Sequence, residues 1–336
     1  MKVIVAAVCL AVALAFSPAS AAEKTVAVGY QLIYNPWKAA IAEGAFEKAA
    51  GWKIDWRRFD SGAKVITALA AGNVQIALAG SSPVAAAVSR GIAIELFWIT
   101  EDIASAEALV VRDGSGITAP QDLRGKTIAV PFASTTHFHL LFALEQFGIA
   151  RQEVTILNMQ PPEIAAAWRR GDIDATFIWD PVLSDVKKNG KVLITSGLLS
   201  RWGKATFDGL VVDRRFAAEN PEFMCRFVKT IAAADERYRR DPDAWTPESP
   251  EVKAIAELTG GDPRAVPGVL ALYGFPTLAE QASKRWLGGG AEGGAARALR
   301  FTSEFLKSER KIPSLLDDYS VAVNPHWVEM ALSGGC

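Results

Sequence analysis

The sequence predicts an α/β protein built from two domains. Its 336 residues exceed the roughly 100–200 residues that one ordinary domain holds. Short β-branched runs alternate with longer stretches of helical spacing, which is typical of βαβ units in parallel sheets covered by helices on both faces. The alternation restarts at Asp122, after a first set of such units. Because 50% of the residues are hydrophobic and 22% are charged, the chain is globular rather than disordered.

Residues 1–22 have the pattern of a secretory signal peptide. Lys2 precedes an apolar run over residues 3–16, and Ser17-Pro18 ends it. Residues 19–21, Ala-Ser-Ala, form a small-x-small cleavage site. A membrane span needs about 20 apolar residues, so this run is too short to be one. We therefore expect export to the periplasm and a mature chain that begins near Glu23.

The first set of elements follows this segment. Asn35-Pro36 predicts a helix start, with asparagine as the cap and proline at the first helical position. Gly72 ends a second helix. The predicted order is strand 25–29, helix 35–50, strand 53–59, helix 63–71, strand 74–79 and a helix over 83–89.

The second set begins with a turn at Asp122 that leads into a short buried strand. From about Pro221 onward the spacing is mostly helical, interrupted by several prolines. The predicted order is strand 127–131, helix 135–147, strand 153–158, helix 161–170, strand 173–179 and helix 181–188.

A short repeat suggests where the chain passes between the domains. Glu107-Ala-Leu-Val-Val111 and Asp208-Gly-Leu-Val-Val212 share the form acid-x-Leu-Val-Val, about 100 residues apart. Strands that lead out of a first domain and back into it would each carry an acid at the same position. The alternative is a chance repeat in a valine-rich chain.

Charge and cysteine content exclude several classes of protein. The 36 basic and 37 acidic residues leave no excess charge for a nucleic-acid or anionic lipid surface, so we expect no nucleic-acid partner. Cys225 and Cys336 follow the predicted signal peptide. They could pair in an oxidising compartment, but a domain of this size needs no disulfide, and we expect free thiols.

Motifs of enzymes and metal sites are missing or misplaced. His137 and His139 are two residues apart, so on a helix their rings point to different faces, and we interpret His139 as a surface or packing residue. The sequence contains no HExxH, CxxC or GxSxG motif. Residues 288–293 match GxGxxG, but no strand precedes them, and we interpret them as a linker between helices. We expect no catalysis, no cofactor and no metal.

Two turns offer hydroxyl groups at the start of a helix. Ser81 and Ser82 follow the strand that ends at Ala79, with Ser82 as the expected cap, and Thr135 and Thr136 follow the strand at 127–131. Free N–H groups and the helix dipole make such positions anion sites. Capping alone is the alternative. In open α/β sheets, ligands bind at the carboxyl ends of the strands, so a facing pair of these turns would form one site.

Glu107 and Asp208 lie beside apolar residues, where burying an unpaired carboxylate is costly. If both are buried, they need a cation, and a ligand ammonium would satisfy both. The alternative partners are Arg112 and Lys204. The cleft could be walled by aromatic faces, which attract an ammonium; the candidates are Trp37, Trp179 and Trp202.

Taken together, these segments resemble the periplasmic taurine-binding family of bacterial ABC importers. The resemblance runs from about residue 25 to residue 320. The segments that carry it are Trp56-Arg-Arg-Phe-Asp-Ser-Gly62, Gly80-Ser-Ser-Pro83, Glu107-Ala-Leu-Val-Val111, Ile128-Ala-Val-Pro131, Ser134-Thr-Thr-His137, Ala166-Ala-Trp-Arg-Arg-Gly-Asp-Ile-Asp174, Trp202-Gly203 with Asp208, and Asp317-Asp-Tyr-Ser320.

The resemblance implies a two-lobed clamshell with two crossover strands, which captures taurine and delivers it to a membrane permease. Lobe 1 would comprise residues 23–106 and 209–320, lobe 2 residues 107–208, and residues 321–336 a C-terminal tail; we expect a monomer. The implied sulfonate ligands are Ser81, Ser82, Thr135 and Thr136, the implied ammonium ligands are Glu107 and Asp208, and the implied secondary lining is Gln31, His137, Trp179 and Trp202.

Asp180 departs from the family pattern, because a small apolar residue is expected after Trp179. We interpret Asp180 as a surface residue; in the cleft it would favour a longer or more cationic amine. Alternative functions are binding of an alkanesulfonate or a nitrogenous solute, a periplasmic sensor, and an enzyme on the same fold.

Overall fold

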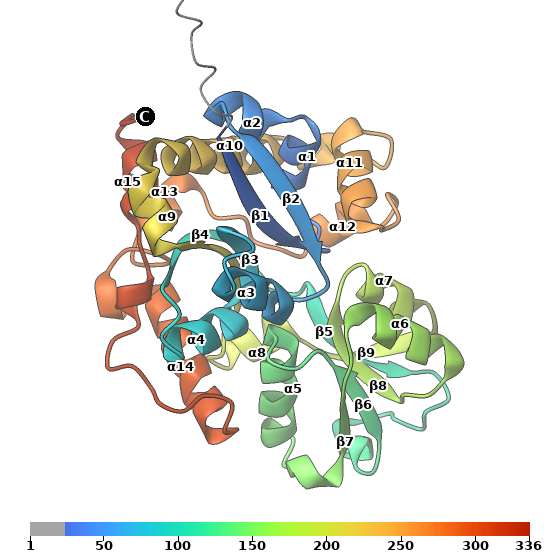
Figure 1. The fold of residues 1–336 in the computed structure, drawn as a ribbon. Helices are drawn as coiled ribbons and strands as arrows, with labels where there is room; N and C mark the ends of the chain where they lie inside the picture. The colour runs from blue at the N-terminus through green and yellow to red at the C-terminus, as the bar shows by residue number, and fades with distance from the viewer. Residues whose placement is uncertain (1–23) are drawn as a thin grey trace, which may run out of the picture.

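The computed structural model describes residues 24–336, so the predicted signal peptide lies outside the described residues. The described chain forms two lobes, each around a five-stranded sheet (Figure 1). The first sheet has the order β2 (Lys53–Phe59), β1 (Thr25–Gln31), β3 (Ile76–Gly80), β10 (Phe207–Asp213), β4 (Ile94–Asp102). The second has the order β7 (Thr155–Asn158), β6 (Thr127–Val130), β8 (Ala175–Trp179), β5 (Glu107–Arg112), β9 (Gly190–Thr195).

Both sheets are mixed, which corrects the prediction of a parallel sheet. β1 pairs in parallel with β2 and β3, and β6 does so with β7 and β8. β10 runs antiparallel to β3 and β4, and β5 runs antiparallel to β8 and β9. The reason is that β5 and β10 arrive from the other lobe. They enter their sheets beside the carboxyl ends of the parallel strands, and therefore run in the opposite direction.

The helices pack on the faces of these sheets (Figure 1). Helices that belong with the first sheet are α1 (Trp37–Ala42), α2 (Ala45–Ala50), α3 (Gly62–Ala70), α4 (Ser81–Ser89), α9 (Arg214–Glu219), α10 (Pro221–Arg240), α11 (Pro250–Thr259), α12 (Val266–Leu270), α13 (Leu278–Ala282), α14 (Gly294–Ser308) and α15 (His326–Leu332). Those of the second are α5 (Thr135–Gln146), α6 (Pro161–Arg170), α7 (Val182–Val186) and α8 (Ser196–Arg201). Short 3₁₀ turns are η1 (Pro120–Leu123), η2 (Arg151–Glu153), η3 (Lys187–Asn189), η4 (Pro242–Ala244), η5 (Gly290–Glu292) and η6 (Ser320–Ala322).

Most predicted elements are found within two residues of their expected ends, but the helix over 35–50 is divided into α1 and α2. Gly44, at φ +63°, separates them in the left-handed region that glycine adopts without strain. Asn35 is not the cap of α1. The cap position is Pro36, and the Asn35 side chain instead accepts a hydrogen bond from Lys38 Nζ at 2.9 Å.

The chain crosses between the lobes twice, before β5 and before β10. The two crossing segments touch, because Ile103 N donates to Thr206 O at 3.3 Å. Ala104 has φ +43°, a conformation that non-glycine residues rarely adopt. The two segments together form the connection between the lobes, and each delivers an acidic residue, Glu107 or Asp208, to the start of a strand.

The C-terminal residues return to the first lobe. α15, in the segment 321–336 expected as a C-terminal tail, packs on α10, and Trp327 Nε1 donates to Glu95 Oε1 at 2.9 Å. Cys225 on α10 forms a disulfide with Cys336, with 6.0 Å between their Cα atoms. The prediction of free thiols is therefore wrong. Packing of α15 brings the end of the chain back to α10, which composition alone does not reveal.

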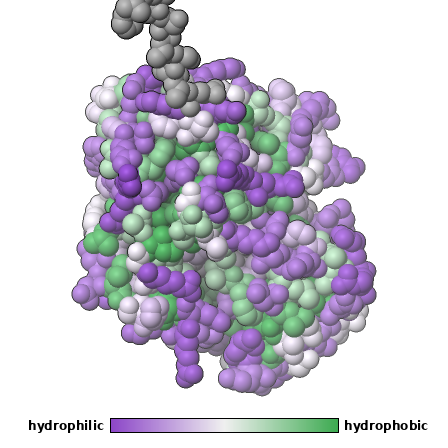
Figure 2. Space-filling model, viewed as in Figure 1, coloured by the Kyte–Doolittle hydropathy of each residue, from purple (hydrophilic) through white to green (hydrophobic). Residues whose placement is uncertain are grey.

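Polar and apolar residues are distributed differently over the visible face. Hydrophilic residues cover most of its rim, whereas pale and hydrophobic ones gather toward the middle, where the lobes meet (Figure 2). Within residues 24–336, no helix combines the length and the apolarity needed to cross a bilayer.

Candidate functional site

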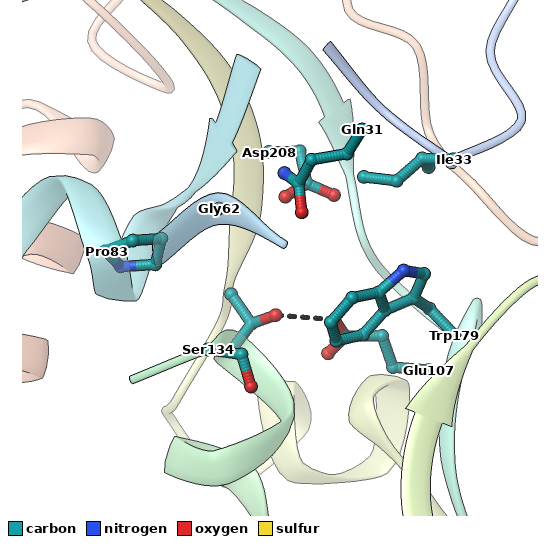
Figure 3. Close-up of a pocket in the computed structure, with 10 residues that line it drawn as sticks. Gln31, Ile33, Gly62, Pro83, Glu107, Ser134, Trp179 and Asp208 are labelled. Carbon is teal, nitrogen blue, oxygen red and sulfur yellow. Dashed lines mark hydrogen bonds between the residues drawn. The ribbon is translucent and has the colours of Figure 1, made fainter. Parts of the chain in front are cut away.

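A narrow pocket lies where the two sheets meet. Gln31 and Asp208 lie on one side and face Glu107, Ser134 and Trp179 on the other (Figure 3). Nine of the ten lining residues lie at the ends of strands or the starts of helices, and Ile33 lies in the loop after β1; the ten are Gln31, Ile33, Gly62, Gly80, Pro83, Glu107, Ser134, Thr135, Trp179 and Asp208.

The two acids reach the pocket because of the crossover topology. Glu107 is the first residue of β5 and pairs with Trp179 at the end of β8. Asp208 is the second residue of β10 and pairs with Gly80 at the end of β3. Each acid therefore lies at the carboxyl end of parallel strands, although it belongs to an antiparallel one. The repeat acid-x-Leu-Val-Val marks these two crossings and is not a chance pattern.

The start of α4 forms the lobe 1 wall. Its cap is Gly80 rather than Ser82, since the helix begins at Ser81. A Cβ atom at Gly80 would lie 2.9 Å from Thr135 Cγ2 and 3.1 Å from Asp208 Oδ1, so only glycine fits here without a shift of its neighbours. Ser81 and Ser82 lie in the chain between the lining residues Gly80 and Pro83; both are fully buried, and neither hydroxyl has a partner among the described residues.

The start of α5 forms the lobe 2 wall. Ser134 is its cap and accepts a hydrogen bond from His137 N at 3.1 Å. Thr135 lines the pocket and donates to Glu107 Oε1 at 2.5 Å. Thr136 is not among the lining residues, and its buried hydroxyl lies 2.8 Å from Ser134 Oγ. Of the four predicted hydroxyl ligands, the structure therefore places only Thr135 on the pocket surface.

Glu107 is a buried carboxyl, and neither of the two candidate cations, Arg112 and Lys204, pairs with it. Arg112 donates to Ile173 O, and Lys204 lies over the rings of Phe142 and Phe301. Burial raises the pKa of Glu107 to about 7, and its hydrogen bonds with Thr135 and Ser196 only partly offset this. A cation brought to Glu107 would favour its charged form.

Asp208 has different surroundings, which the sequence did not indicate. Its pKa is raised by burial and by the nearby Glu101 and Glu107 carboxyls, whereas Lys38 lowers it. Lys38 is fully buried, and burial lowers its own pKa to about 7. Glu101 pairs with Asp208 across β4 and β10, and its pKa is raised to about 7 by burial. Asp208 therefore lies near one buried lysine and two other acids, Glu101 and Glu107.

The other predicted lining residues divide into two groups. Gln31 and Trp179 line the pocket, and Gln31 Nε2 donates to Leu78 O at 3.1 Å. His137 does not line it; its ring stacks on Phe132 with 4.4 Å between centroids. Trp202 is 44% exposed and lies outside the pocket lining.

Two further sequence interpretations can now be compared with the structure. Asp180 is fully buried rather than on the surface, and its Oδ1 accepts a hydrogen bond from Ser184 N at 3.0 Å, so the surface interpretation is wrong. Residues 288–293 join α13 to α14 through η5, with no strand before them, as the linker interpretation predicts. Within the described residues, no three His, Cys, Asp or Glu side chains gather as a metal site.

Known proteins resemble this chain in sequence. The family model described as NMT1/THI5 like matches residues 37–245. The taurine-binding periplasmic protein of Escherichia coli (strain K12) is 40% identical over 320 residues, which cover 95% of this chain and 98% of the relative. This chain belongs to the NMT1/THI5-like family.

Solved structures of other proteins share the fold of this chain. The periplasmic aliphatic sulphonate binding protein SsuA from Escherichia coli superposes with a TM-score of 0.72 at 21% identity, covering 92% of this chain and 100% of that one. The desulfurization enzyme DSZB superposes with a TM-score of 0.65 at 16% identity, covering 94% and 100%. At these identities the likeness concerns the fold alone. It confirms the two-lobed α/β architecture, and it also shows that this fold carries enzymes as well as binding proteins.

Proposed function

We propose that the protein is a periplasmic solute-binding protein that captures taurine between its lobes and delivers it to the permease of an ABC importer. The observation that carries this proposal is the convergence of Glu107 and Asp208 on one pocket beside the starts of α4 and α5. Taurine has an ammonium at one end and a sulfonate at the other. The pocket offers carboxyls for the first and hydrogen-bond donors for the second.

The ammonium end is assigned to the acids. Glu107 is 3% exposed and Asp208 is 6% exposed, so an uncompensated charge on either is costly. An ammonium between them removes this cost and gains charge-assisted hydrogen bonds. Trp179 adds an aromatic wall at the same place, which favours a cation further.

The sulfonate end is assigned to the two helix starts. Helices α4 and α5 direct their first-turn N–H groups and their dipoles toward the space between the lobes. Thr135 adds a hydroxyl at the pocket surface, and Ser81 and Ser82 at the start of α4 have hydroxyls with no described partner. A sulfonate is a strong-acid anion, so neutral donors are sufficient to hold it.

Two alternatives concern the ligand and the class of protein. An alkanesulfonate without an amine would use the helix starts but bring no cation to Glu107, which favours taurine. An enzyme on this fold needs a nucleophile or a general base in the pocket. In this proposal the carboxyls of Glu107 and Asp208 hold the ligand ammonium rather than act as general bases, and Cys225 and Cys336 are joined to each other rather than free as nucleophiles.

The test is calorimetric titration of the ligand-stripped mature protein with taurine and, in parallel, with ethanesulfonate. We expect tight binding of taurine and much weaker binding of ethanesulfonate. Replacement of one acid, in Glu107→Gln or Asp208→Asn, should weaken taurine about 10- to 100-fold, which corresponds to the loss of one charge-assisted hydrogen bond.

Ethanesulfonate should lose no more than about threefold in the same variants, since it does not contact the acids. The matched control is Glu145→Gln, an exposed glutamate on α5, which should bind both ligands as the unmodified protein does. Equal losses for both ligands in the acid variants would assign Glu107 and Asp208 to structure and leave a general sulfonate receptor.

A further inference from the structure

Behind Glu107, a row of three buried side chains leads away from the pocket. We call Glu107, Ser196 and His139 the proton row. Ser196 Oγ lies 3.1 Å from Glu107 Oε2 and 2.7 Å from His139 Nδ1. The other ring nitrogen, Nε2, lies 2.7 Å from the carbonyl oxygen of Lys204. Ser196 and His139 are both fully buried, so water does not compete for these contacts.

The contacts fix how many protons the row holds. A carbonyl oxygen only accepts, so His139 Nε2 must carry a hydrogen that it donates to Lys204 O. The two remaining contacts, Nδ1 to Ser196 and Ser196 to Glu107, each need one hydrogen. The Ser196 hydroxyl supplies only one of them. A carboxylate beside a neutral imidazole would therefore leave two acceptors facing each other in a buried place, which is costly.

One additional proton satisfies both contacts, and there are two places for it. On Glu107, it gives a neutral acid that donates to Ser196, which in turn donates to His139 Nδ1. On His139, it gives an imidazolium that donates to Ser196, which in turn donates to a Glu107 carboxylate. Thr135 donates to the other carboxyl oxygen, Oε1, in both arrangements.

We propose that Ser196 and His139 are positioning residues that hold the proton of Glu107 in reserve, so that binding of a ligand ammonium moves it from Glu107 to His139. In this step the Glu107 Oε2–H bond breaks and that proton bonds to Ser196 Oγ. The original Ser196 proton leaves for His139 Nδ1 at the same time. The products are a carboxylate that faces the ammonium and an imidazolium behind it, and no proton is exchanged with water.

Charge balance favours this movement over release of the proton. Taurine carries one positive and one negative charge, so the buried site keeps its net charge only if the row keeps its proton. In the free site, burial raises the pKa of Glu107 to about 7 and lowers that of His139 to about 4, which puts the proton on Glu107. An ammonium beside Glu107 stabilises the carboxylate and reverses that preference.

Other ionisable groups surround the row and must be kept constant in the test. On the lobe 1 side these are Asp208 on β10, Glu101 on β4 and Lys38 on α1, which influence one another's pKa. Burial raises the pKa of Tyr273, and the nearby carboxyls of Glu101, Asp208, Asp180 and Glu107 raise it further. On the lobe 2 side they are His137 on α5, Asp180 after β8, and Lys204, whose ammonium lies over Phe142 and Phe301.

The experiment uses ¹⁵N-histidine NMR and calorimetry on the whole mature protein; it rests on the proposed amine ligand. With three histidines in the chain, His139 is assigned by the signal that His139→Asn removes. We expect a neutral Nε2–H imidazole in the free protein and a doubly protonated ring with saturating taurine. Ethanesulfonate, which has no amine, should leave the ring neutral. A ring that stays neutral with taurine bound overturns the relay.

The variants Ser196→Ala and His139→Asn test the same step through protons released to buffer. Titrations at pH 6 in two buffers of different ionisation enthalpy should show almost no proton release in the unmodified protein. Each variant should release about one proton per taurine, and its affinity should fall about tenfold per pH unit below the pKa of Glu107. Equal proton release in all three proteins overturns the relay.

Failure of the relay is separable from failure of the proposed function. If taurine does not bind the unmodified protein, the proposed function fails, and the row is examined in the free protein alone. The infrared difference between that protein and Glu107→Gln at pH 6 should then contain the carbonyl band of a protonated carboxyl. Absence of this band contradicts the proton count.

Discussion

Because the carboxyl group of Glu107 is deeply buried, its protonation state affects the stability of the protein as well as ligand binding. Its pKa is about 7 in the folded protein, against 4.5 for an ordinary glutamate. Between these two values the unfolded chain loses its proton while the folded protein keeps it. The unfolded state is therefore increasingly favoured as pH rises from 4.5 to 7, and above 7 the penalty stays constant.

Replacement of Glu107 by glutamine should remove this pH dependence, because the amide stays neutral. At pH 4 we expect the two free proteins to have similar stability. At pH 8, Glu107→Gln should be more stable by about 3 kcal/mol, the free-energy equivalent of the pKa difference. Urea unfolding at pH 4, 6 and 8 measures this, with Glu145→Gln as the exposed control. A stability difference that does not change with pH would contradict the raised pKa.

At this scale the sequence indicated the two acids, which the structure places in one pocket, but it did not indicate their surroundings. Glu107 and Asp208 were found because each acid stands inside an apolar run with the same pattern. Lys38 follows Trp37 and precedes Ala39, Ala40 and Ile41, so it resembles an ordinary lysine on an amphipathic helix. Its burial beside Asn35 depends on α1 packing against other elements, and local sequence does not encode such packing.

At the scale of elements, strand and helix positions followed from periodicity, but strand direction did not. The βαβ alternation predicts β1, β3, β6 and β8 as parallel neighbours or near neighbours, and these strands do run in the same direction within each sheet. Nothing in the local pattern of β5 or β10 distinguishes an antiparallel strand from a parallel one. Direction is decided by where the chain comes from, which is a property of the topology.

The contact between α10 and α15 gives a prediction at the same scale. The disulfide between Cys225 and Cys336 closes a loop with a sequence separation of 111 residues, and such a loop limits the unfolded chain strongly. We expect Cys336→Ser to lose about 2–4 kcal/mol of unfolding free energy, measured by urea denaturation.

Reducing agent serves as the control for this loss. It should lower the stability of the unmodified protein to that of Cys336→Ser and leave the variant unchanged. If oxidised protein and variant unfold at the same urea concentration, the disulfide contributes nothing to stability. Taurine affinity should be equal in both proteins, since Cys225 and Cys336 are not among the residues that line the pocket.

At the scale of the whole molecule, the described pocket exists only while the two lobes lie against each other. Gly80 on β3 and Asp208 on β10 belong to the first sheet. Glu107 belongs to the second sheet, and Thr135 is the first residue of α5. We propose that the lobes, divided near residues 106 and 208, move as bodies about the crossing segments. In this proposal ligand contacts across the pocket favour the closed arrangement.

Gly80 provides the most direct test of this closure. Its backbone has φ −66°, which alanine adopts freely, so Gly80→Ala should fold normally. In the closed arrangement, however, the added Cβ would lie 2.9 Å from Thr135 Cγ2 on the opposite lobe. The same Cβ would lie 3.1 Å from Asp208 Oδ1 on its own lobe, a contact that a small movement of the Asp208 side chain relieves, so the methyl group opposes closure more than folding. We expect taurine affinity to fall at least about tenfold, a cost of about 1.4 kcal/mol, with unfolding free energy of the free protein nearly unchanged.

Small-angle scattering separates closure from a simple loss of contacts in this variant. The unmodified protein should become more compact with saturating taurine, and Gly80→Ala should do so incompletely. Gly268→Ala on α12, where an added Cβ meets nothing within 4 Å, is the matched control and should behave as the unmodified protein does. Gly80→Ala could instead bind taurine with normal affinity and become as compact as the unmodified protein. The lobes of the bound protein would then lie further apart than in this structure, and a ligand could not contact Gly80 and Thr135 directly at the same time.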